Sequence, residues 1–179
     1  MAPSEQQALQ AQLSDGSLAG SWTLDPARSA VVLHTRHTFG LLALRGVFGT
    51  VSGHGTVTAD GNASGVITVT AASVDTKNPR RDKHLRSADF FDVENHPEFT
   101  FAVDSVTLTD GGARVAGTLT VRERTNPASF DARVATDNGE VVLDGELPVN
   151  RADYGLTWNF LGIAAMHSTI EVHAVFTRG

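Results

Sequence analysis

From Trp22 onward, hydrophobic and polar residues alternate with a period of two. In the stretch 114–122, Val115, Leu119 and Val121 face one way while Arg114 and Thr120 face the other. The same alternation recurs in residues 29–37, 129–134, 140–147 and 168–176. One apolar face and one polar face are typical of antiparallel strands. Turn signals at 60–61, 110–112 and 137–139 separate the runs. The pattern predicts seven or eight strands joined by hairpins, which form a sandwich or a barrel.

The residues predicted to point inward are small. In residues 47–58, one face carries Val47, Gly49, Val51, Gly53, Gly55 and Val57. The stretch 65–74 contains nothing larger than isoleucine on either face. A solid core of this span would need more bulk, because protein interiors are filled to crystal density. Small inward residues indicate a barrel with space inside. The alternative is a tightly curved sandwich in which the glycines only relieve crowding.

Length and composition narrow the class of protein. The chain has 179 residues, no cysteine and a formal net charge of −6. This length predicts one β domain, over 21–179, preceded by an N-terminal tail over residues 1–20. A short helix in the tail is expected to end near Leu13, and we assign the tail no function. The negative charge argues against nucleic-acid binding. The N-terminus lacks the features of a secretory signal, and no apolar run approaches the about 20 residues of a membrane span. A cytoplasmic location is the expectation.

A charged insert at residues 79–92, PRRDKHLRSADFFD, interrupts the strands. Asn78 is a suitable N-cap, Pro79 suits the first helical position, and the helix is predicted to end near Asp89. Asp82 and Arg86 have the spacing of an exposed i,i+4 ion pair. The helix is too short to be stable alone in water, so the rim of the barrel must support it.

These residues, with others along the chain, resemble the YceI-like polyisoprenoid-binding family. The resemblance covers about residues 22–178. Its most specific elements are Ser-Val-Asp-Thr at 73–76, Arg-Asp-x-His-Leu at 81–85, Asp-Phe-Phe at 89–91 and the run 150–156, NRADYGL. It implies an all-β, lipocalin-like, extended eight-stranded antiparallel barrel with the short helix, about 79–89, flanking its mouth. It also implies an apolar tunnel for an isoprenoid or another long-chain amphiphile. Glu123 departs from the glycine that the family pattern leads us to expect.

The implied function is binding, carriage or sequestration of a polyisoprenoid, an isoprenoid quinone or a fatty-acyl ligand. Phe90 and Phe91 are predicted to lie at the partly solvated mouth. A homodimer and a transient contact with a membrane are compatible with this role, and no cofactor is expected. The predicted ligand contacts are Leu33, Thr35, His37, Phe39, Arg81, His84, Leu85, Phe90, Phe91, Phe99, Phe101 and Trp158.

Two of these side chains have a second interpretation. His37, on the inward face, is either a buried histidine with a local hydrogen-bond partner or a contact to the ligand. The apolar loop around Trp158 either plugs one end of the barrel or lines the tunnel. Nearby, Arg151 and Asp153 are expected to hold a strand end and the loop that follows it.

Catalysis and metal binding are the chemical alternatives. His34 and His37 point to opposite faces of a strand, and Asp82 and His84 diverge on a helix, so neither pair chelates a metal. Arg81, Asp82 and His84 form either a catalytic cluster or, as we prefer, ion pairs to the barrel rim. The inward set Ser29, Thr35 and His37 would suit an isomerase or cyclase of a prenylated or polyketide substrate. A donor and a base converging on one point of the cavity would favour that enzyme.

Overall fold

The computed structural model describes residues 3–37, 42–158 and 164–179. Its strands form a closed antiparallel barrel, because β1 pairs with both β4 and β11. The eight strands of the ring, in spatial order, are β1 (Gly20–Leu24), β4 (Val51–Val57), β5 (Ala63–Thr70), β7 (Glu98–Thr109), β8 (Gly112–Val121), β9 (Arg124–Asp137), β10 (Glu140–Asn150) and β11 (Ala164–Arg178). Closure excludes the tightly curved sandwich and confirms the predicted barrel.

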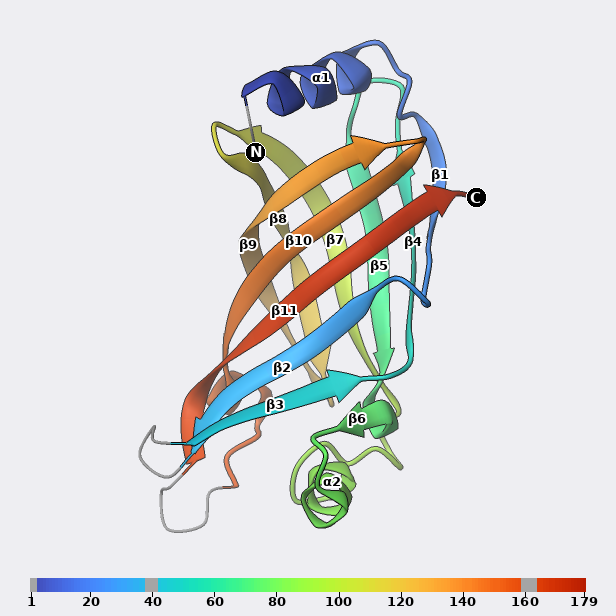
Figure 1. The fold of residues 1–179 in the computed structure, drawn as a ribbon. Helices are drawn as coiled ribbons and strands as arrows, with labels where there is room; N and C mark the ends of the chain where they lie inside the picture. The colour runs from blue at the N-terminus through green and yellow to red at the C-terminus, as the bar shows by residue number, and fades with distance from the viewer. Residues whose placement is uncertain (1–2, 38–41, 159–163) are drawn as a thin grey trace.

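Three further strands lengthen the wall beyond the ring (Figure 1). They are β2 (Ala30–His37), β3 (Leu42–Phe48) and β6 (Val74–Asp75). Strands β1 and β2 pair with successive stretches of β11, and β3 and β4 pair with β2 and β1 in turn. Strands β1 and β2 therefore act together as one long strand with a break, and so do β3 and β4. These two long, broken strands produce the extended shape.

The break between β3 and β4 reverses the inward face. Phe48 and Val51 are both buried although three positions separate them, and Val47 is only half-buried. The prediction that Val47 and Gly49 share the inward face of Val51 is therefore wrong. The chain bends at residues 49–50, and a bend of two residues shifts the alternation by one.

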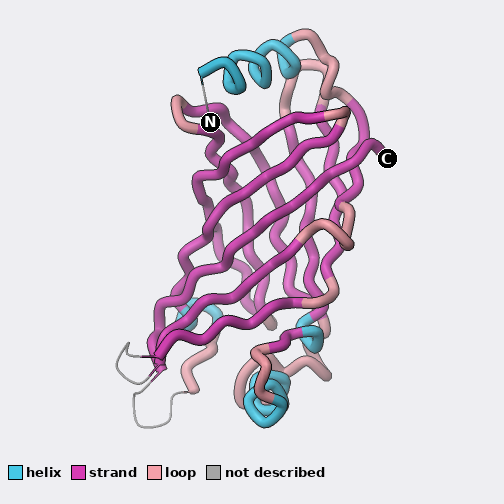
Figure 2. Tube along the Cα trace, in the orientation of Figure 1, coloured by secondary structure: helices cyan, strands magenta, loops and turns pink. Residues whose placement is uncertain are grey.

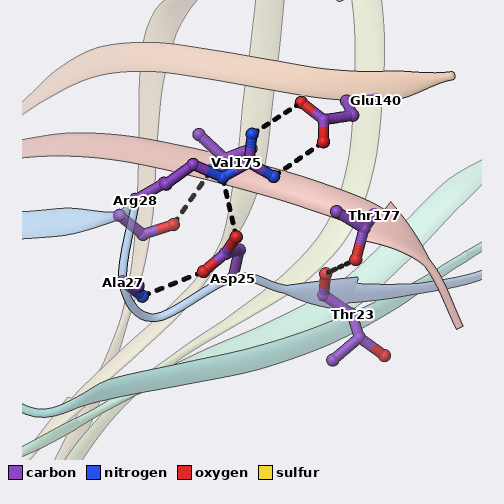
Figure 3. A network of polar contacts seen from close by, with 8 residues as sticks. Thr23, Asp25, Ala27, Arg28, Glu140, Val175 and Thr177 are labelled. Carbon is purple, nitrogen blue, oxygen red and sulfur yellow. Dashed lines mark hydrogen bonds and ion pairs between the residues drawn. The ribbon is translucent and has the colours of Figure 1, made fainter. Parts of the chain in front are cut away.

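The break between β1 and β2 is held by a polar network (Figure 3). The guanidinium of Arg28 donates two hydrogen bonds to Glu140, at 2.9 and 2.7 Å, and one to Asp25 at 2.7 Å. Ser29 accepts a hydrogen bond from the amide of Val175. These contacts join the break to β10 and β11, where the barrel closes. The guanidinium of Arg28 lowers the pKa of both Asp25 and Glu140 below their ordinary values.

Two helices lie at opposite ends of the barrel (Figures 1 and 2). Helix α1 (Pro3–Ser14) covers one end, and α2 (Pro79–Arg86) lies at the other. As predicted, Asn78 is the N-cap of α2 and accepts a hydrogen bond from the amide of Arg81 at 3.1 Å. The helix ends at Arg86, before the predicted Asp89, because Ser87 is extended and bonds back to His84. None of the helices in the described ranges is long and apolar enough to span a membrane.

Candidate ligand-binding site

The barrel interior contains two apolar cavities, one next to α1 and one next to the segment that follows α2. We call them the α1 chamber and the α2 chamber. Their volumes are about 140 and 100 Å³. Both far exceed the roughly 10–15 Å³ that holds one water molecule, so they are not packing defects. The α1 chamber is lined by Leu9, Leu13, Trp22, Val134 and Phe176, among others, and the α2 chamber by Leu33, Phe90, Phe91, Phe99 and Leu119, among others.

Small inward residues create the space in the α1 chamber. Gly55, Ala63 and Gly65 line its wall on β4 and β5. At Gly65 a side chain is not tolerated, since an added Cβ would lie 2.4 Å from the carbonyl oxygen of His54. The predicted hollow interior is therefore present.

Three residues line both chambers and separate them. They are Ile67, Phe101 and Phe130. The rings of Phe101 and Phe130 lie 5.7 Å apart between centroids. Gly145 on β10 makes room for Phe130, because a Cβ there would lie 2.5 Å from its ring. The two rings therefore divide an apolar interior that would otherwise be one cavity.

An aromatic cluster forms the wall of the α2 chamber nearest α2. The ring of Phe91 lies 4.9 Å from Phe90, 5.0 Å from Phe99 and 6.2 Å from Phe48. Phe90 and Phe91 are only 7% and 3% exposed. The prediction that this doublet is partly solvated is wrong, because the turn after α2 folds it into the core. It lines the chamber and stabilises the barrel at the same time.

Helix α2 is attached by hydrogen bonds to β6 and its flanks. The buried Asp82 carboxylate accepts from the amide and hydroxyl of Thr76, at 3.0 and 2.5 Å. Arg81 also donates to Thr76, and Arg86 donates to the carbonyls of Ala72 and Val74. The predicted exposed Asp82–Arg86 pair does not form, and Arg81 and Asp82 are tied to Thr76 rather than joined in a catalytic cluster. The surrounding backbone offered partners that sequence spacing did not reveal.

The hairpin between β8 and β9 holds the segment after α2 from the other side. Glu123, at the position where glycine was expected, lies 3.4 Å from the imidazole of His96. The turn places its positive φ, 57°, on Arg122 rather than on Glu123, so it needs no glycine at Glu123.

The structure separates the predicted contacts into four groups. Leu33, Phe90, Phe91, Phe99 and Phe101 line the α2 chamber. Leu85 is buried in the same core, and the Arg81 guanidinium is hydrogen-bonded to Thr76. The ring of His84 packs against that of the half-exposed Trp158, with centroids 4.3 Å apart. The hydroxyl of Thr35 is buried without a hydrogen-bond partner. Phe39 and the side chain of His37 lie outside the described residues.

Many residues that line the chambers were not among the predicted contacts, and two sets of them bear on function. The first is Leu9 and Leu13 of α1, which line the α1 chamber although residues 1–20 were expected to be a tail without a role. Their i,i+4 spacing is the signal that marks an apolar helix face. The second is Arg151 and Ser168, which line the α2 chamber. A buried arginine facing an apolar cavity has no sequence signature.

Arg151 holds the segment that follows β10, as expected, whereas Asp153 is exposed. The guanidinium of Arg151 donates to the carbonyl oxygens of Ala165, Leu156 and Trp158 at 2.9, 3.3 and 3.4 Å. The guanidinium carbon also lies over the ring of Phe90, 5.4 Å from its centroid. Burial lowers the pKa of the guanidinium from its ordinary value. Among the described residues that line the chamber, Arg151 is therefore the one charged side chain, and its position is fixed.

The histidines with carboxylate partners are not gathered into a metal site. His34 pairs with Glu171 at 2.7 Å and His173 with Asp144 at 2.5 Å, both on the outer surface. Within the described ranges, no three His, Asp or Glu side chains lie close enough together to hold a metal ion.

Comparison with known proteins now adds to this geometry. The model of the YceI-like domain matches residues 22–177. The chain belongs to the YceI-like family. A UPF0312 protein of Staphylococcus aureus (strain N315) is 29% identical over 150 residues, which cover 78% of this chain and 84% of that protein.

Solved structures share the fold of this YceI-like protein. BcnA of Burkholderia cenocepacia has a TM-score of 0.78 at 23% identity, covering 85% of this chain and 98% of that chain. A polyisoprenoid-binding domain from Saccharophagus degradans has a TM-score of 0.68 at 14% identity, covering 88% and 98%. At these identities the likeness establishes the barrel architecture.

Proposed function

We propose that the protein binds a long-chain amphiphile inside the barrel and carries or sequesters it. The chain of the ligand would be a polyisoprenoid, an isoprenoid quinone tail or a fatty-acyl group. The observation that carries this proposal is the pair of apolar chambers separated only by Ile67, Phe101 and Phe130. Burial of the ligand chain supplies most of the affinity, at about 0.8 kcal/mol per methylene removed from water.

The comparisons support this class of ligand. The YceI-like family match spans nearly the whole barrel, and one structural neighbour is described as a polyisoprenoid-binding domain. An elongated interior suits a linear chain better than a compact ligand, because a linear chain can occupy both chambers in succession. The partition must then move aside, which makes Phe101 and Phe130 the residues that determine the length of chain accepted.

The lining supports binding rather than catalysis. The described residues that line the α2 chamber include Thr100, Tyr154, Arg151 and Ser168 but no Asp, Glu or His. A proton-transfer enzyme such as an isomerase needs a base within hydrogen-bond reach of its substrate. In the α1 chamber His54 contributes to the wall, but it is an exposed residue of β4.

Organic extraction and native mass spectrometry of the purified protein test the proposal. We expect the wild-type protein to release a long-chain apolar molecule or, after delipidation, to bind added long-chain probes such as cis-parinaric acid. Ile170→Trp fills the α2 chamber and should reduce ligand content. Glu171→Trp is the matched control, because the adjacent strand residue faces solvent. A wild-type protein that neither releases nor takes up any long-chain molecule would contradict the proposal.

A further inference from the structure

Two polar side chains that line the α2 chamber, Arg151 and Ser168, each have one buried polar atom without a hydrogen-bond partner. The Nη2 of Arg151 is buried and makes no hydrogen bond, although Nε and Nη1 of the same group are bound to carbonyl oxygens. Arg151 is only 6% exposed. The other bonds fix the plane of the guanidinium, so Nη2 is oriented before any ligand arrives.

Two hydroxyl groups on neighbouring strands are in the same unpaired state. Ser168 on β11 is 6% exposed, lines the α2 chamber, and its Oγ has no hydrogen-bond partner. Ser168 pairs with Val149, two residues before Arg151, and on its other side with Thr35, whose hydroxyl is also buried and unpaired. Buried polar atoms are normally satisfied. Three unsatisfied atoms, two on the neighbouring strands β2 and β11 and one directly after β10, therefore indicate a missing partner.

The charge of Arg151 is also uncompensated. No ion pair joins it to a carboxylate within the described residues, and none of the described lining of the α2 chamber is acidic. A guanidinium stays protonated in proteins, and a buried charge without a counter-charge is costly. The contact with the ring of Phe90 offsets part of that cost. An anionic oxygen would offset the rest of the cost of burying the charge, and it would accept a hydrogen bond from Nη2.

We propose that Arg151 and Ser168 form the headgroup site of the α2 chamber, and that it recognises an anionic oxygen of the amphiphile, as in a carboxylate or a phosphate. This inference rests on the proposed function and adds the chemical class of the headgroup. The chain of the ligand runs from Arg151 along the aromatic cluster toward Phe101 and Phe130. The head is therefore buried with the chain.

Ligands with one tail and different heads test this on the wild-type protein. Hexadecanoic acid, hexadecyl phosphate and hexadecanol are titrated against bound cis-parinaric acid. We expect both anions to bind about tenfold or more tightly than the alcohol, since hydrogen bonds to charged groups are the stronger ones. Equal binding of acid, phosphate and alcohol overturns the headgroup site and leaves the proposed function standing. Failure of all three to bind, with no uptake of the probe, contradicts the proposed function itself.

Variants identify the residues. Arg151→Gln should reduce the affinity for the acid to that for the alcohol while the affinity for the alcohol stays unchanged. Ser168→Ala should weaken binding of the acid a few-fold and removes no bond that holds the fold. Because Arg151 also supports three carbonyl groups, a thermal melt accompanies each titration. If Arg151→Gln does not fold, the preference of wild type for the anions and its reduction in Ser168→Ala decide the matter. An unchanged preference in Ser168→Ala excludes Ser168 from the site.

Discussion

Phe101 on β7 and Phe130 on β9 meet inside the barrel, with ring centroids 5.7 Å apart and planes tilted by 53°. Both rings line both chambers, so this contact divides an interior that is otherwise continuous. Gly145 accommodates the ring of Phe130 on its far side, where no side chain fits. The partition formed by Ile67, Phe101 and Phe130 therefore depends on a fourth residue, Gly145, which leaves room for one of its rings.

Removing one ring should join the chambers. Phe130→Ala is expected to lower the free energy of unfolding by about 3–5 kcal/mol, which is typical of a buried phenylalanine. It should also shift binding toward longer chains, because the interior then becomes one cavity. Competition against a fluorescent fatty acid, with alkyl carboxylates of increasing length, measures the preference. Val134→Ala is the control, since Val134 is buried on the same strand but lines only the α1 chamber. An unchanged chain-length preference in Phe130→Ala would show that the partition does not limit the ligand.

Helix α1 should act as the cover of the α1 chamber. Leu9 is 3% exposed and packs into that chamber, while Ala11 on the same helix is exposed. Leu9→Ser is expected to destabilise the protein by about 2–5 kcal/mol, by analogy with other large-to-small core changes, and to increase binding of the dye ANS to exposed apolar surface. Ala11→Ser is the matched control and should leave both measurements unchanged. Similar behaviour of the two variants would mean that α1 does not close the chamber.

The Phe90–Phe91 doublet should be essential to the fold. Replacing both with serine removes two buried rings, at about 3–5 kcal/mol each, which rivals the total stability of an ordinary domain. We expect this variant to unfold or aggregate at room temperature, as seen by circular dichroism and gel filtration. The adjacent exposed pair provides the control, Ala88→Ser with Asp89→Ser. A folded double mutant that merely lost its ligand would contradict the burial of the doublet.

The Arg28 network should make stability depend on pH. The guanidinium lowers the pKa of Asp25 and Glu140 in the folded protein, so both carboxylates stabilise the fold above the unfolded value of about 4. That stabilisation is lost as the pH falls through the lower folded values. The melting temperature of Arg28→Met should therefore lie below that of wild type at pH 7, and the difference should shrink below about pH 4. Arg114→Met is the control for loss of one exposed arginine, because Arg114 contacts only one carboxylate in the described residues, that of Asp131, besides the hydroxyl of Ser129. A difference that stays constant down to pH 2 would exclude the network as its source.

The sequence by itself determined the class of the fold and the existence of an apolar interior. Alternating runs such as 114–122 specify which side of a strand is buried, because successive side chains point to opposite faces. Asn78 and Pro79 likewise mark the start of α2, since helix capping depends on a few adjacent residues. These are local effects, and local effects can be read along a chain. The small size of the inward residues indicated a hollow barrel but left a tightly curved sandwich open.

Only the tertiary structure decided how that interior is divided and where its charge lies. Phe101 and Phe130 are remote in sequence, and nothing local shows that their rings meet. Arg151 looked like a structural arginine, and its unpaired nitrogen is defined by carbonyl groups from two other segments. The burial of Phe90 and Phe91 and the role of Leu9 depend in the same way on what packs against them. Contacts of this kind arise from the closure of the barrel, which brings distant strands together and leaves no local signal.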